Sequence, residues 1–187
     1  MLAADPPGTS LSRDAIELCH RAQAAAPDEK PALLAQSLAR ADEAVAADDH
    51  DALAYFARFC ALGEQARLAG MSLTSLLKVR PLRRAVDETL ALAPDFPDAL
   101  LGKGALLLGL PRILGGDAVE GERLVRRALE LDPEYVHARL TLAHVLADAG
   151  RRDEAREEAS RALAAADRKH DVGDAAEARS LLDDLAR

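Results

Sequence analysis

The sequence is poor in aromatic residues and has no tryptophan. Aromatic residues make up only 3% of the 187 residues, whereas hydrophobic residues as a whole make up 49%. The apolar content is therefore mainly alanine and leucine, which are strong helix formers because neither loses much side-chain freedom in a helix. No segment alternates polar and apolar residues with a period of two, so we expect no β-sheet. The composition predicts an all-α protein whose helices approach one another closely.

Long apolar runs are also missing. No stretch reaches the roughly 20 apolar residues that a helix needs to span a bilayer, so membrane insertion is not expected. The first eight residues lack the basic and apolar stretches of a secretory signal. As written, the chain is expected in the cytoplasm, and in the periplasm if a signal peptide has been removed. We expect residues 1–11 to be disordered or extended, and residues 12–187 to form a single domain.

Only two cysteines are present. Cys19 and Cys60 both fall on apolar faces of predicted helices. Buried free thiols are common at such positions, and this is the interpretation that the sequence favours. The alternative is a disulfide between them, which would imply an oxidising compartment.

Basic residues are outnumbered by acidic ones, 24 to 32, and the formal net charge is −8. Because phosphate binding needs clustered lysine and arginine, nucleic acid is not expected as a partner. One basic run stands out, consisting of Lys78, Arg80, Arg83 and Arg84. Such a run is usually a solvated helix face, and the alternative is a contact with an anion.

Patterns that indicate catalysis or metal binding are absent. His137 and His144 are seven residues apart on a predicted helix, about 10 Å along its axis, so they do not share one ion. Cys19 and His20 are neighbours whose side chains point about 100° apart on a helix, which makes them a poor nucleophile and base pair. The glycines at 115–116 precede a helix but lack the Gly-Lys-Ser/Thr ending of a phosphate-binding loop. We therefore expect no cofactor, no metal and no enzymatic activity.

Three junctions along the chain resemble one another. Each ends one segment with helical apolar periodicity and opens the next, and they align on Ala52, Ala99 and Ala138. Repeating units of about 40 residues, each two helices long, are typical of a helical solenoid. Longer spacing in the second unit leaves the helix limits within 64–82 open. We predict four hairpins followed by one closing helix, at 12–48, 51–94, 97–132, 136–167 and 173–186.

The last hairpin has the clearest pattern. Its apolar residues recur with a helical period, Gly150 offers a left-handed C-terminal cap, and Pro133 ends the helix before it. The pattern of small and large residues resembles the tetratricopeptide repeat (TPR), well over 97–167 and in degenerate form over 12–94. It departs from the family at Ala159, where a large aromatic residue usually stands. The residues that carry the resemblance are Ala138, Leu142, Ala143, Leu146, Gly150, Ala155, Ala162 and Leu163.

The TPR resemblance implies an α-α superhelix, a TPR-like solenoid of about four helical hairpins plus a C-terminal capping helix. It also implies a non-catalytic scaffold that binds a protein or peptide in a concave groove. A second resemblance lies in the stretch Leu110–Asp117, followed by a helix that ends at Pro133. This stretch resembles the T-component of bacterial TRAP transporters, which implies a periplasmic accessory protein that binds a small ligand or a transport partner.

The concave side of stacked hairpins is lined by the first helix of each unit. Residues on the inner faces of these first helices would form a groove with apolar walls and a few polar side chains, which suits a peptide. Alternatively, the final helix fills this groove, or a second protomer does so and the chain is a homo-oligomer. The loop 110–117 is a second candidate surface, from which Arg112 would reach a partner. The residues expected to line the groove are Leu101, Ala105, Leu108, His137, Leu140 and His144.

Overall fold

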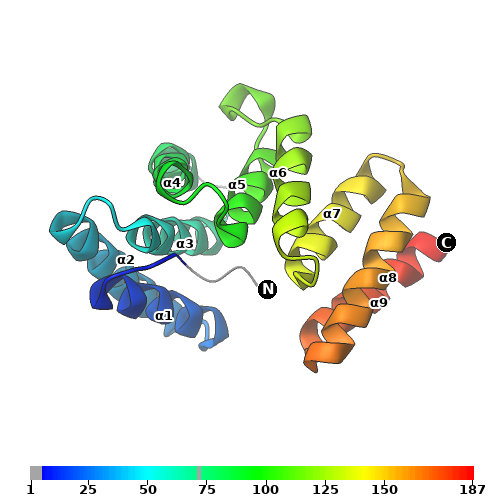
Figure 1. Cartoon of the computed structure of the whole chain (residues 1–187), viewed down its shortest axis with the longest axis horizontal. Helices are drawn as coiled ribbons and strands as arrows, with labels where there is room; N and C mark the ends of the chain where they lie inside the picture. Colours follow the sequence, from blue (N-terminus) through cyan, green and yellow to red (C-terminus); the bar gives the residue numbers. More distant parts are fainter. Residues whose placement is uncertain (1–5, 71–72) are drawn as a thin grey trace. The chain divides into compact units, whose positions relative to one another are not determined.

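A computed structural model describes residues 6–70 and 73–187 of the chain, with side chains left out over 73–78. These residues form nine α-helices and one short 3-10 helix, without any strand (Figure 1). The all-α fold predicted from the composition is therefore confirmed, as is the order of four hairpins and a final helix. The helices are α1 (Ser10–Ala24), α2 (Lys30–Ala47), α3 (Ala52–Leu68), α4 (Leu73–Leu92), α5 (Pro97–Gly109), α6 (Ala118–Leu131), α7 (Val136–Asp148), α8 (Arg152–Lys169) and α9 (Val172–Ala186), and the 3-10 helix η1 (Arg112–Leu114) lies between α5 and α6.

The described residues divide into two compact units, 6–99 and 100–187. The single domain expected over 12–187 stays a prediction. At the N-terminus, α1 begins at Ser10 and the hydroxyl of Thr9 accepts a hydrogen bond from the Ser12 amide. Residues 1–5 of the segment expected to be disordered or extended lie outside the described residues, so that expectation also stays a prediction.

The first unit consists of the hairpins α1–α2 and α3–α4, with α3 packed against both α1 and α2. Small side chains allow the close packing, because Ala15, Ala41 and Ala57 meet in one buried cluster. The buried Ser37 hydroxyl donates a hydrogen bond of 2.8 Å to the Ala15 carbonyl oxygen and so joins α2 to α1. The three phenylalanines belong to one core cluster, where Phe56 and Phe96 meet edge to face at 4.7 Å between ring centres.

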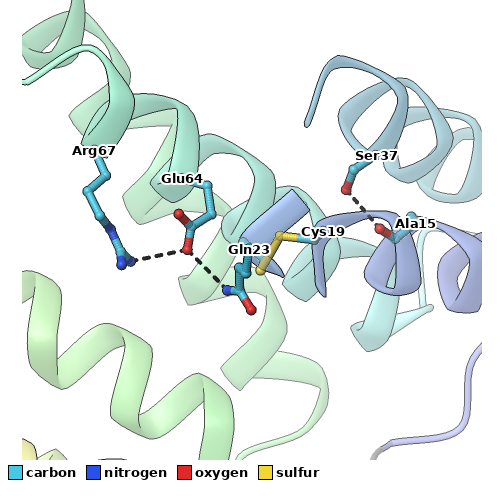
Figure 2. Close-up of a disulfide and its surroundings, with 7 residues drawn as sticks. Ala15, Cys19, Gln23, Ser37, Glu64 and Arg67 are labelled. Carbon is cyan, nitrogen blue, oxygen red and sulfur yellow. Dashed lines mark hydrogen bonds and ion pairs between the residues drawn. A yellow bond between two sulfur atoms is a disulfide. The ribbon is translucent and has the colours of Figure 1, made fainter. Parts of the chain in front are cut away.

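A disulfide joins Cys19 of α1 to Cys60 of α3, with the two Cα atoms 6.5 Å apart (Figure 2). The free-thiol interpretation favoured from the sequence was therefore wrong. Each cysteine does lie on an inward helix face, as expected, but α1 and α3 pack against each other and bring the two faces together. Next to the disulfide, the Gln23 amide donates a hydrogen bond of 3.0 Å to the Glu64 carboxylate.

The second unit contains most of α5 and all of α6 to α9. α5 and α6 meet at two glycines, since a Cβ atom on Gly104 would lie 2.9 Å from the Gly121 carbonyl oxygen and 2.8 Å from a Val125 methyl carbon. α7 packs against α8, and α9 contacts both. The carboxylate of Asp117 caps α6 by accepting hydrogen bonds from the Val119 and Glu120 amides.

Candidate functional site

The residues predicted to form the groove on α7 face α9. His137 Nδ1 lies 3.3 Å from an Asp174 carboxylate oxygen, and His144 Nε2 lies 3.3 Å from a Glu177 carboxylate oxygen. Between these pairs, Leu140 is only 2% exposed and packs in one cluster with alanines of α8 and α9. This face of α7 is thus covered by the final helix, which is one of the alternatives that the sequence left open.

The sequence predicted that Leu140 contacts a partner. In the structure α9 buries its side chain, so Leu140 cannot contact a ligand while α9 is in place. His137 and His144 stand at the edges of the contact, with 66% and 51% of their side chains exposed. Burial raises the pKa of the Asp174 carboxyl, and the nearby His137 imidazole lowers it by a smaller amount. The two histidines therefore have structural partners within the chain.

Several contacts hold α9 in place. The Asp171 carboxylate caps its N-terminus by accepting a hydrogen bond of 3.0 Å from the Asp174 amide. At its other end, the guanidinium groups of Arg152 and Arg156 donate to the Leu185 carbonyl oxygen at 2.8 and 2.9 Å. The apolar stripe of α9 is buried and its opposite side is polar and exposed, as expected for a helix that closes the end of a solenoid. The buried stripe consists of Ala175, Ala178, Leu181 and Leu185.

The predicted groove residues on α5 are not covered by α9 and differ from those on α7 in their exposure to solvent. Ala105 is exposed, whereas Leu101 and Leu108 are each half-buried. Leu108 also packs close to Gly121 of α6. On α5, Ala105 is therefore open to solvent and Leu101 and Leu108 are partly open. On α7, α9 covers Leu140 and contacts His137 and His144 at its edges.

The loop 110–117 has a tightly fixed backbone. The Pro111 carbonyl oxygen accepts hydrogen bonds from the Leu114 and Gly116 amides at 2.9 and 3.1 Å. Gly115 has a φ of 87°, a conformation that glycine adopts readily. A Cβ atom on Gly116 would lie 1.7 Å from the Leu110 carbonyl oxygen, so no other residue fits there.

The same loop presents an apolar tip. Ile113 is 92% exposed, and Val119 at the start of α6 is 80% exposed. Arg112, predicted to reach a partner, is exposed beside Ile113. The apolar character of this tip was missed from the sequence, because an isoleucine between proline and glycine gives no sign of which way it points.

Two further features of the described residues were not predicted. An open hollow of about 470 Å³ lies between α1 and α2, with Leu18 among acidic and basic side chains such as Glu17, Arg21 and Glu43. Asp48, Asp49 and His50 in the loop between α2 and α3 could hold a metal ion by geometry, but all three are exposed. The expected absence of a metal stays a prediction.

Helical hairpins, the last of them followed by an amphipathic helix, are typical of a helical-repeat fold. The sequence model of the tetratricopeptide repeat matches residues 112–172. The match covers less than half of the chain, so residues 112–172 are similar to tetratricopeptide repeats.

Solved TPR structures share the fold. A thermophilic TPR protein from Thermus thermophilus is 20% identical, and the alignment covers 91% of this chain and 82% of that chain with a TM-score of 0.68. MamA is 16% identical over 85% of this chain and 80% of that chain, with a TM-score of 0.58. No curated protein matches the sequence. These comparisons give no support to the resemblance to the TRAP T-component.

No helix in residues 6–70 and 73–187 has the length and apolar character that crossing a bilayer requires.

Proposed function

We propose that this chain is a non-catalytic scaffold that binds a helical segment of a protein partner on the exposed face of α5. The observation that supports this proposal is the way α9 lies on α7. On that face, alanines of α9 pack against Leu140, and two acidic residues flank them and reach histidines. An amphipathic helix with small apolar residues is thus a shape that the first helix of a hairpin accepts.

On α5, the corresponding residues remain available. Ala105 is open to solvent, with Leu101 and Leu108 half-buried on either side of it along the helix. Small and medium apolar side chains of this kind let a second helix approach closely. Arg112 and Ile113, on the rigid loop that follows α5, would contact the end of the same partner.

The test compares two alanines that are exposed on helices. Ala105→Glu places a charge on the proposed binding face, whereas Ala176→Glu places the same charge on the outer side of α9. We expect a partner that co-purifies with the full chain to be lost with Ala105→Glu and retained with Ala176→Glu. Equal retention in both variants would contradict the proposal.

For the compartment, we infer an oxidising environment such as the periplasm. The support for this inference is the disulfide between Cys19 and Cys60, because thiols in the cytoplasm are kept reduced. Alkylation with a mass-tagged maleimide, done on freshly lysed cells with and without reductant, measures the redox state. Full labelling without reductant would place the chain in the cytoplasm instead.

The proposal also includes the predictions about nucleic acid, cofactors and catalysis. With a formal net charge of −8, the chain is not expected to bind nucleic acid as its main partner. We also expect no cofactor and no catalytic activity. A homo-oligomer remains an alternative occupant for the α5 face, and light scattering of the purified chain would reveal it.

A further inference from the structure

Most arginines of this acidic chain are neutralised within it. Arg139 pairs with Glu158 at 2.5 Å, and both side chains are almost buried, at 12% and 13% exposed. Arg151 bonds both Glu122 and Glu154, at 2.8 and 2.6 Å. Other arginines meet acidic residues on their own helix or the next one. A minority of the described arginines have no acidic partner, among them Arg21 of α1 and Arg112 of the loop after α5.

The outer face of α4 brings several weakly paired arginines together. Arg80 and Arg83 are exposed, and in the part of the chain that the structure describes neither side chain has a hydrogen bond or ion pair. Arg84 is 84% exposed, and its contact with Glu88 is long, at 3.8 Å. We call these three residues the α4 arginine face. The side chain of Lys78, the fourth residue of the basic run, lies outside the described residues.

Helix geometry places the three guanidinium groups on one side of α4. Residues at positions i, i+3 and i+4 share a face, and here they span about 6 Å along the axis. The buried stripe of α4 lies on the opposite side, so the arginines point away from the core. That stripe consists of Leu82, Ala85, Val86 and Thr89.

Like charges at these spacings repel one another in the free protein. An anion that binds between them removes this repulsion and adds charge-assisted hydrogen bonds. Arginine suits carboxylates in particular, because its planar fork donates two parallel hydrogen bonds to the two oxygens. The α4 arginine face is therefore poorly satisfied alone and well suited to carboxylates.

The size of the face and the charge of the chain limit the kind of anion. A face about 6 Å long matches two or three carboxylates, whereas duplex nucleic acid is held by several phosphate contacts along a longer track. The net charge of −8 repels long polyanions and anionic membranes at a distance. A short acidic segment of a protein meets much less of this repulsion.

We propose that the α4 arginine face docks an acidic peptide segment of a protein partner through Arg80, Arg83 and Arg84. Its residues are different from those of the exposed face of α5. It rests on the proposed scaffold function only in that the ligand is a protein.

The test measures binding of a fluorescently labelled oligoglutamate peptide to the full chain by anisotropy, at low and at near-physiological ionic strength. The triple variant Arg80→Gln, Arg83→Gln, Arg84→Gln removes the face. The matched control removes the same charge from three exposed arginines that already have acidic neighbours, Arg123→Gln, Arg127→Gln and Arg161→Gln. Circular dichroism and thermal melting establish that both variants fold.

We expect the α4 variant to bind the peptide roughly tenfold or more weakly than the unaltered chain, and the control to stay within about twofold. Equal loss in both variants would show a general charge effect and overturn the proposal. The same measurement with duplex DNA and with vesicles containing anionic lipid decides between ligand classes. Tighter binding of either through the α4 face would also overturn it.

Ala105→Glu separates this proposal from the scaffold function on α5. That variant should bind oligoglutamate within about twofold of the unaltered chain, because it leaves all three arginines of the α4 face in place. If it loses its co-purifying partner but keeps the peptide, both proposals stand. If oligoglutamate binding is absent at low ionic strength while the partner still depends on Ala105, only the α4 proposal fails.

Discussion

At the scale of single residues, Asp51 holds the start of two helices together. It is 3% exposed, and its Oδ2 accepts hydrogen bonds from the amide and the hydroxyl of Thr9, both at 2.9 Å. Its Oδ1 accepts one of 3.0 Å from the Ala54 amide at the start of α3. We expect Asp51→Asn to lower the free energy of unfolding by about 1–3 kcal/mol at neutral pH, measured by chemical denaturation. The control Asp49→Asn, at a 77% exposed side chain, should change little.

The same carboxylate should make stability depend on pH. Burial raises the pKa of Asp51, but the hydrogen bonds from Thr9 and Ala54 outweigh it and hold this pKa below its ordinary value. A lowered pKa in the folded state adds stability that is fully present above the unfolded pKa of about 3.9 and is lost as the pH falls through the folded pKa. The difference between the unaltered chain and Asp51→Asn should therefore shrink below about pH 4. A difference that is constant from neutral to acidic pH would contradict this assignment.

Two neighbouring glutamates of α8 allow a matched comparison. Glu158 is 13% exposed and bonds Arg139 of α7 at 2.5 Å, whereas Glu157 is 60% exposed and pairs with Arg161 on its own helix. We expect Glu158→Gln to lower the free energy of unfolding by about 1–3 kcal/mol, because it leaves a nearly buried guanidinium without its charge partner. Glu157→Gln should cost less than about 0.5 kcal/mol. Similar losses in both variants, measured by urea denaturation, would show that the contact between α7 and α8 does not account for the stability that Glu158 adds.

At the scale of elements, the crossing of α5 and α6 depends on glycine. A Cβ atom on Gly104 would lie 2.9 Å from a backbone oxygen of α6, which cannot move aside as a flexible side chain can. We expect Gly104→Ala to lower the thermal unfolding midpoint, with a cost of about 1–3 kcal/mol from the forced shift of the helices. Gly109→Ala is the control, since no atom lies within 4 Å of a Cβ built there. It should be neutral or slightly stabilising, because alanine favours helix over glycine.

Local signals in the sequence were sufficient to predict the helices. Gly150 adopts a positive φ of 74° after α7, as its position after the apolar pattern predicts. The final helix was placed within one residue of its start at Val172. Within the uncertain limits of 64–82, α3 ends at Leu68 and α4 continues through Pro81. That outcome depends on packing, since a proline inside a helix is locally unfavourable.

The candidate site was harder to predict from the sequence than the helices, because it depends on contacts between distant segments. His137 and His144 were correctly placed on one face of α7, but no local pattern shows that Asp174 and Glu177 would meet them. The disulfide also joins distant segments, because its cysteines are 41 positions apart in the sequence. The basic run on α4 could be seen in the sequence. Its weak pairing could not, because the ion pairs of the arginines are known only from the structure.

At the scale of the whole molecule, only one of the two compact units contains a disulfide. The bond joins residues 41 apart within residues 6–99, and residues 100–187 have no cysteine. Closing a loop of this length restricts the unfolded chain, which stabilises the folded state by about 4 kcal/mol in the chain-entropy account. Reduction should therefore weaken the first unit much more than the second.

Hydrogen exchange measured by mass spectrometry tests this difference in a single experiment. With reductant, amides of α1 to α3 should exchange faster, while those of α7 to α9 keep their protection. The double variant Cys19→Ser, Cys60→Ser should exchange like the reduced chain and should not respond to reductant, which controls for other effects of the reagent. If reduction changes neither unit, the disulfide adds no stability, because the packing of α1 on α3 already restricts the chain enough. If it weakens both units equally, the two units unfold as one, and the division at residue 99 has no counterpart in stability.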